Sequence, residues 1–218
     1  YSSNNPNSAV RKAGYTKAQN CVVLVEATDF YAENVSIINL YGALSSRYTG
    51  GLGKDGQAEA LITRNDRISL YNCVLVSFQD TWWCRHNAYS ENLAYLNNTL
   101  IEGRTDYILG SGNVFIENSK FYNTGDGAYI TASGETGTWG FVMKDCTVDG
   151  ENGITAFSFG RPYKPNTKTV WINTTLKMDI VAPHWSSWSS IPALYGEYNT
   201  VDKNGAVIST EGKTVGSG

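Results

Sequence analysis

Two aspartates have the residue type and the spacing for acid–base catalysis. Asp80 lies in SFQDTWW and Asp106 in GRTDYILG, each beside an apolar run where an unpaired charge is costly. Two carboxyl groups held close together do not both ionise easily, so we expect one ionised as nucleophile or base and one protonated as acid. Gln57 and Gln79 can add amide donors, and Arg161 in FGRPYK can supply a cation to the ionised carboxylate.

A repeat in the sequence indicates which fold would position these residues. Strand-like segments of the form apolar-x-Asn/Asp-small-x-apolar recur, each followed by turn residues, and helical periodicity is nearly absent. Their central residues are Asn39, Asn72, Asn98, Asn118, Asp145 and Asn173. Irregular repeats of this length predict a solenoid, and the strand content makes it a parallel β-helix. A β-sandwich is the competing fold, but its regularly spaced hairpin signals are not evident.

The repeat places the two aspartates in register. Asp80 and Asp106 each lie eight residues after the asparagine of their own repeat. Equal offsets stack in successive coils, and neighbouring parallel strands lie about 4.8 Å apart. A single aspartate at a strand end more often caps a turn, but two at the same offset favour a site. Asp126 shares the offset, yet it lies in the turn-like NTGDGAY and is expected to be a solvated turn residue.

The composition favours one all-β domain over residues 1–218. Charged residues make up 17% of the chain, and its 22 glycines and 14 tyrosines are typical of short strands joined by turns. The formal net charge of −3 argues against nucleic acid as a partner. No apolar run is long enough to predict a membrane span. The opening YSSNNPNSAVRKAG lacks the basic and apolar regions of a signal peptide.

The cysteines do not predict a metal site. They are widely spaced and match no zinc pattern, and we expect buried free thiols rather than disulfides at Cys21, Cys73, Cys84 and Cys146. No cofactor and no metal is expected.

Four motifs in order resemble the pectin methylesterase (pectinesterase) family: GQAEAL at 56–61, QDT at 79–81, DYILG at 106–110 and GRPY at 160–163. Weaker similarity in the segments between and after these motifs extends the resemblance to nearly all of residues 20–200. It implies a right-handed parallel β-helix that hydrolyses the C6 methyl esters of homogalacturonan to methanol and free carboxylate. The family's opening strand has no match here, so the chain is expected to begin one or two coils late. Residues 183–218 are expected to form an aromatic-rich, polar tail along the helix.

The resemblance also implies a role for each residue of the site. Asp106 would be the nucleophile and Asp80 the general acid/base. Arg161 would hold Asp106 ionised, while Gln57 and Gln79 would form the oxyanion hole.

Aromatic side chains are expected to line a groove for the sugar chain. The resemblance implies that Tyr163, Trp185 and Trp188 lie in this groove. Tyr163 stands where the family usually has Trp. Trp82 and Tyr107 directly follow the two acid motifs and are expected in the same groove. The polar context PHWSSWSS favours exposure of the tryptophans after Pro183.

The expected partner is pectin, and the expected protein is a monomer that acts outside the cell, in a cell wall or periplasm. A non-catalytic polysaccharide-binding β-helix is the alternative from another class. A serine esterase could use Ser158 in AFSFG with Asp179 and His184, but that motif needs a strand-to-helix turn. A β-helical lyase would need calcium carboxylates, and an inverting glycosidase would need carboxyls about 6.5–9.5 Å apart.

Overall fold

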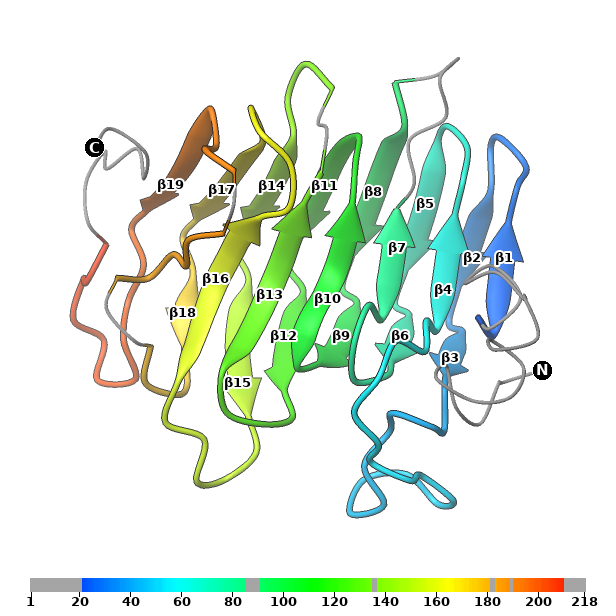
Figure 1. The fold of residues 1–218 in the computed structure, drawn as a ribbon, viewed down its shortest axis with the longest axis horizontal. Coiled ribbons are helices and arrows are strands. Elements are labelled where there is room, and N and C mark those ends of the chain that lie inside the picture. Colours follow the sequence, from blue (N-terminus) through cyan, green and yellow to red (C-terminus); the bar gives the residue numbers. More distant parts are fainter. Residues whose placement is uncertain (1–20, 85–90, 135–136, 181–182, 189, 210–218) are drawn as a thin grey trace.

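The computed structural model describes residues 21–84, 91–134, 137–180, 183–188 and 190–209. Within these ranges the chain forms strands and turns and no helix, so no helix could span a membrane. The strands form three sheets in which all pairs of neighbours run parallel. In the described ranges six coils each give one strand to each sheet, and β19 adds a seventh strand to one of them. Successive coils follow one another as right-handed turns (Figure 1). The predicted parallel β-helix is confirmed.

Sheet A forms the face nearest the viewer in Figure 1. Its strands are β1 (Val23–Val25), β4 (Leu61–Thr63), β7 (Trp82–Cys84), β10 (Thr105–Gly110), β13 (Ala128–Ser133) and β16 (Phe157–Pro162). Sheet B holds β2 (Tyr31–Glu33), β5 (Ile68–Tyr71), β8 (Leu93–Asn97), β11 (Asn113–Glu117), β14 (Phe141–Lys144), β17 (Lys168–Ile172) and β19 (Leu194–Tyr198). Sheet C holds β3 (Ser36–Ile38), β6 (Val74–Val76), β9 (Leu100–Gly103), β12 (Lys120–Asn123), β15 (Thr147–Gly150) and β18 (Thr175–Leu176).

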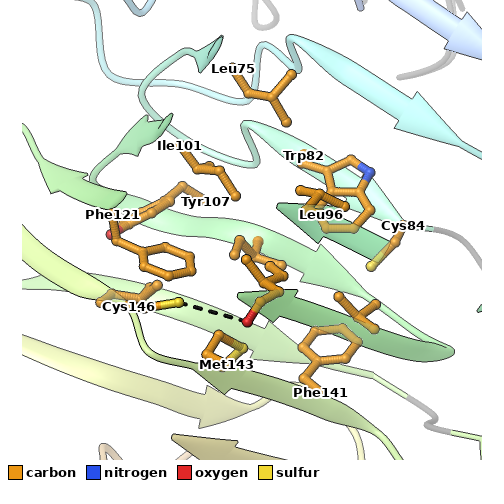
Figure 2. Packing of buried hydrophobic residues seen from close by; sticks show 14 of the residues in the cluster. Leu75, Trp82, Cys84, Leu96, Ile101, Tyr107, Phe121, Phe141, Met143 and Cys146 are labelled. Carbon is orange, nitrogen blue, oxygen red and sulfur yellow. Dashed lines mark hydrogen bonds between the residues drawn. The ribbon is translucent and has the colours of Figure 1, made fainter. Parts of the chain in front are cut away.

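Side chains that face inward stack in columns along the helix axis. The column of sheet C runs through Ile37, Leu75, Ile101, Phe121, Val148 and Leu176, all buried. In the later coils the ring of Trp171 packs against Phe121 and Phe159, with ring centroids 4.8 and 4.7 Å apart. Figure 2 shows how such residues fill the interior from all three sheets. Alternate residues of each strand therefore enter one continuous apolar core, which explains the alternation in the sequence.

All four cysteines are free and buried, as predicted. Cys84 and Cys146 donate weak hydrogen bonds from Sγ to the carbonyls of Leu109 and Ile116, at 3.4 and 3.7 Å. Burial raises the pKa of Cys84 to about 12 and that of Cys146 to about 11. These thiols stay protonated at neutral pH and act as core side chains.

A ladder of asparagines marks the corner between sheets B and C. The residues at this corner adopt a left-handed conformation, which Asn and Asp tolerate best among residues with a side chain; they are Asn34, Asn72, Asn98, Asn118, Asp145, Asn173 and Asn199. Their amides bond from coil to coil, as Asn199 does to Asn173 at 3.0 Å. The assignment of the first repeat to Asn39 was wrong: Asn34 occupies the corner, whereas Asn39 begins the next loop and donates to the Glu59 carbonyl at 3.1 Å. The pattern itself favours Asn34, since AENVSI has an apolar residue at its last position where IINLYG has Gly42.

The segment expected to be a tail continues the coil instead. Within it β19 pairs with β17 and extends sheet B by one strand. Residue 189 and residues 210–218 of this segment lie outside the described residues.

The long loop over residues 39–60 is anchored by a buried carboxylate. Glu102 on β9 is fully buried and accepts hydrogen bonds from Arg47 Nε and Tyr48 Oη, both at 2.9 Å. The Arg47 guanidinium also lies over the Tyr122 ring, 3.8 Å from its centroid. Burial raises the pKa of Glu102, while Tyr48 and Arg47 oppose that rise. Since this loop leads into Gln57, the Glu102 anchor supports one wall of the candidate site.

We predict that Arg47→Ala lowers the free energy of unfolding at pH 7 by about 3 kcal/mol, because it leaves the buried Glu102 charge poorly compensated. The raised pKa of Glu102 gives the sign of the pH effect: the loss becomes smaller as the pH falls and Glu102 takes up a proton in the folded state. Urea unfolding at pH 7 and pH 5 measures both effects.

The control is Arg67→Ala, which breaks surface ion pairs with Asp29 and Asp66 and should lower the free energy of unfolding much less. Equal losses for the two variants would contradict the anchoring role of Glu102.

Candidate active site

The predicted catalytic residues meet in one pocket on the outer face of sheet A. The pocket has a volume of about 280 Å³ and is lined by Gln57, Gln79, Asp80, Asp106, Leu109, Arg161, Tyr163 and Trp188. Its lining comes from residues up to 131 positions apart (188 − 57), drawn from several successive coils. Only the stacking of those coils brings these side chains together.

The two aspartates occupy successive coils. Gln79 pairs with Thr105 as a parallel bridge, and the Asp80 amide donates to the Thr105 carbonyl at 3.0 Å. Asp80 and Asp106 therefore follow one another at one strand spacing, about 4.8 Å. They are 1% and 4% exposed, so both carboxyl groups lie largely out of water.

Both aspartates also have an unusual backbone conformation. The φ angles of Asp80 and Asp106 are 57° and 50°, in the left-handed region that costs energy for residues other than glycine. The β10–β13 pairing shifts register between Thr105 and Ile108. Such an irregularity turns a side chain away from the direction that strict alternation would give it.

Arg161 holds Asp106 through a two-pronged ion pair. Its Nε and Nη2 donate to Oδ1 and Oδ2 of Asp106 at 2.8 and 2.7 Å. This geometry stabilises the ionised carboxylate and fixes its orientation. Burial by itself would lower the pKa of Arg161, but the hydrogen bonds and charge of Asp106 outweigh it, so that pKa lies above its usual range.

The two glutamines stand in line beside the aspartates. Gln57 pairs with Gln79 as a parallel bridge, and Gln79 pairs in turn with Thr105. Both glutamines are half-buried and line the pocket. Their neutral amides can donate hydrogen bonds to an anion without transferring a proton to it.

Two aromatic side chains stand at the mouth of the pocket. Tyr163 and Trp188 are 44% and 42% exposed, and their ring centroids lie 5.5 Å apart. The Trp188 ring also lies over the Arg161 guanidinium, 4.1 Å from ring centroid to Cζ. These two aromatics are placed to meet a ligand that enters the pocket.

The predicted surface positions of Trp82 and Tyr107 were wrong. Both side chains are fully buried inside the solenoid. Trp82 Nε1 donates to Thr63 Oγ1, and Tyr107 Oη donates to Asn123 Oδ1, each at 3.1 Å. Nearness in sequence to the acids misled the prediction. Tyr107 directly follows Asp106 and points to the opposite face, and the left-handed conformation of Asp80 breaks the alternation before Trp82.

The expected exposure of Trp185 was wrong as well. It is 3% exposed and packs on the Tyr195 ring, with centroids 4.5 Å apart. It lines a second pocket of about 340 Å³ that also includes Tyr129 and Ser158. A polar context did not imply exposure, because Trp185 pairs with Gly160 of β16 and its ring joins the apolar core.

The residues of the serine-esterase alternative do not form a triad. Asp179 pairs with Lys203 at 2.7 Å, and His184 Nδ1 lies 2.5 Å from Glu197 Oε1. The His184 ring lies edge-on to that of Phe159, the neighbour of Ser158 that points to the other face of β16. The described residues also contain no helix to form the strand-to-helix turn.

The protein also has a groove that is larger than the candidate active site and lies on another sheet. It occupies about 520 Å³ on the outer face of sheet B and is lined by mainly apolar side chains, among them Leu93, Phe115 and Trp139. No carboxyl group is among its lining residues. Among the residues that the structure describes, no group of three His, Cys, Asp or Glu side chains is arranged to hold a metal ion.

Two residues near the pocket were missed by sequence reasoning. Leu109 forms part of its wall. Tyr129 on β13 lies under Arg161, with its ring centroid 4.1 Å from the guanidinium carbon. The only sequence signal for Tyr129 was its place directly before ITA, one of the weaker family segments.

The fold and the pocket together define a parallel β-helix protein with a buried carboxylate pair on the outer face of one sheet. The sequence model of the pectinesterase family matches residues 4–215, and the chain belongs to that family. The family assignment made from four motifs is thereby confirmed.

Relatives of known name agree with this assignment. The chain is 29% identical over 192 residues to a probable pectinesterase A of Neosartorya fischeri, which covers 84% of this chain and 54% of the relative. It is 30% identical over 172 residues to pectinesterase 31 of Arabidopsis thaliana, which covers 77% and 49%. The chain thus spans about half the length of these relatives.

Solved structures show the same fold. The pectin methylesterase from carrot superposes with a TM-score of 0.74 at 21% identity, over 95% of this chain and 66% of that one. The Aspergillus niger enzyme in deglycosylated form gives 0.74 at 23% identity, over 97% and 67%.

We predict that Asp80→Asn stabilises the folded protein by about 1 kcal/mol at pH 7, because a second acid buried beside Asp106 must take up a proton on folding and Asn needs none. The gain should shrink at acid pH, where Asp80 is protonated in the unfolded chain as well. Urea unfolding measures it, with Asp179→Asn at an exposed pair as control. A clear loss of stability at pH 7 would contradict the like-charge interpretation.

Proposed function

We propose that this chain carries the catalytic site of a pectinesterase that hydrolyses C6 methyl esters of homogalacturonan. One observation supports this above all others. A buried carboxylate, Asp106, is held by both prongs of Arg161 in a pocket where a second buried acid, Asp80, lies one coil away. An ionised acid beside a second acid is what covalent ester hydrolysis by aspartate requires.

In the first half of the proposed reaction Asp106 attacks the ester carbonyl carbon. The carbonyl oxygen becomes an oxyanion, and the amides of Gln57 and Gln79 stabilise it by hydrogen bonds. Protonated Asp80 then gives its proton to the departing methoxide, so that methanol leaves and an acid anhydride joins the substrate to Asp106.

In the second half water opens the anhydride. Asp80, now ionised, takes a proton from the water as the water attacks the former ester carbon. The bond to Asp106 breaks, and both aspartates return to their starting states. The product leaves as a carboxylic acid that releases its proton to the solvent and becomes a free carboxylate. Arg161 keeps Asp106 oriented throughout, which restricts the attack to one direction.

The proposed substrate is a pectin chain that meets the exposed rings of Tyr163 and Trp188 at the pocket mouth. Two pectin methylesterase structures of the same fold, one of a mutant, contain hexasaccharides, and their identities to this chain are 22% and 20%. We further propose that the protein acts as a monomer outside the cell, where pectin is found.

The direct test is methanol release from methylated pectin in the presence of a chelator. Asp106→Ala should lower kcat at least about 10³-fold, and Gln57→Ala or Gln79→Ala about 10²–10³-fold. Asp126→Ala is the matched control: it has the same repeat offset, but it is exposed and bonds a turn through Thr155. Activity that survives Asp106→Ala, or that is lost with the chelator, would refute the mechanism.

We predict a bell-shaped dependence of kcat/KM on pH. The rate should fall at acid pH because Asp106 must be ionised to attack, and at alkaline pH because Asp80 must carry a proton. Arg161→Lys should move the acid limb to higher pH, since a single ammonium cannot bond both carboxylate oxygens. A rate that stays flat to strongly acidic pH would contradict the paired-acid mechanism.

The non-catalytic alternative gives a different result in the same assay. A binding module would retain pectin on an affinity gel and release no methanol. The spacing of one coil also lies below the range of an inverting glycosidase, which needs room for water between its carboxyls.

A further inference from the structure

Arg161 is enclosed between two aromatic rings. Its guanidinium carbon lies 4.1 Å from the ring centroid of Tyr129 and also 4.1 Å from that of Trp188. The edge of the same guanidinium bonds Asp106. Both kinds of contact suit the planar cation, which stacks through its faces and donates through its edge.

The path of the Arg161 side chain explains why it needs support. Arg161 lies on β16 and Asp106 on β10, with β13 between them in sheet A. The side chain must therefore cross a strand, a distance of about 9–10 Å at two strand spacings. Tyr129 lies on β13, on the crossing path, and pairs with Thr105 on one side and Ser158 on the other. Its ring forms the surface over which the guanidinium reaches Asp106.

The two rings differ in how they are held. Trp188 belongs to the segment over residues 183–188 and is 42% exposed at the pocket mouth, where a ligand meets it. Tyr129 is half-buried and belongs to a strand that is paired on both sides. Tyr129 therefore provides a contact that does not depend on substrate.

We propose that Tyr129 is a positioning residue for the Arg161–Asp106 pair. Its ring fixes the guanidinium over β13 and limits access of water to the side of the ion pair away from substrate. Asp106 is thereby kept ionised and correctly directed before substrate binds. This inference rests on the proposed function for its kinetic effect, but the geometry it describes belongs to the free protein.

The test compares Tyr129→Leu, which removes the π face, with Tyr129→Phe, which keeps it. Tyr129→Leu should lower kcat about 3- to 30-fold with little change in KM, and should move the acid limb of the pH profile upward. Tyr129→Phe should stay within about 2-fold of the wild type. Tyr95→Leu removes another half-buried, outward-facing tyrosine, from sheet B, and should leave kcat unchanged.

Two further measurements separate positioning from folding and from substrate binding. The NMR signal of Arg161 Nε–H should be sharp in the wild type and in Tyr129→Phe, and should exchange faster with water in Tyr129→Leu. Trp188→Leu should raise KM more than it lowers kcat. If Tyr129→Leu does not fold, progressive fluorination of a phenylalanine at position 129 weakens the π face at constant shape, and kcat should fall with each fluorine.

The possible outcomes distinguish the positioning role of Tyr129 from the proposed function of the protein. Equal kcat, pH profile and Nε–H exchange for Tyr129→Leu and Tyr129→Phe, in an active enzyme, would overturn the positioning role. A wild-type protein that releases no methanol would instead refute the proposed function, and the Nε–H exchange would still test the contact between Tyr129 and Arg161.

Discussion

The stacking of successive coils at one strand spacing is the constraint on which this structure depends. Parallel pairing at about 4.8 Å places equivalent residues of each coil directly above one another. Like residues then meet like residues: the apolar side chains of sheet C form a column, and the corner asparagines bond from coil to coil. Such contacts are favourable for apolar groups and for amides, which can both donate and accept.

The same stacking is unfavourable for acids, because it brings two carboxyl groups close together. The candidate site contains such a pair. Asp80 and Asp106 lie one coil apart, buried and in left-handed conformation. A structure selected for stability alone would not place two carboxyls there. Arg161 bonds both carboxylate oxygens of Asp106, which stabilises the ionised form of that acid. This two-pronged pair is the basis for assigning Asp106 the role of nucleophile in the proposed reaction.

Support for the site comes from coils on both sides of the acids. On one side the buried Glu102 binds the loop that leads into Gln57, through Arg47 and Tyr48. On the other side Arg161 reaches back across β13 over the ring of Tyr129. The pocket is thus a product of several neighbouring coils. Its geometry would change if any one of them shifted in register.

The sequence by itself determined the fold class and most of the pocket, because residues at equal offsets in successive repeats of a solenoid lie next to one another in space. A repeat with an asparagine at its corner was enough to predict that Asp80 and Asp106 would stack. The motifs added Gln57, Gln79 and Arg161, all of which line the pocket. The family followed from the same motifs. The first repeat was misplaced at Asn39, although the segment around Asn34 fits the pattern better.

The tertiary structure alone decided which side chains face the solvent and which cross between coils. Trp82, Tyr107 and Trp185 were expected on the surface and lie in the core, because the course of the backbone at each position turns these side chains inward. The role of Tyr129 depends on the route of one arginine side chain over a strand between distant residues. Such a route is a property of three-dimensional packing, and no local pattern of residues carries it.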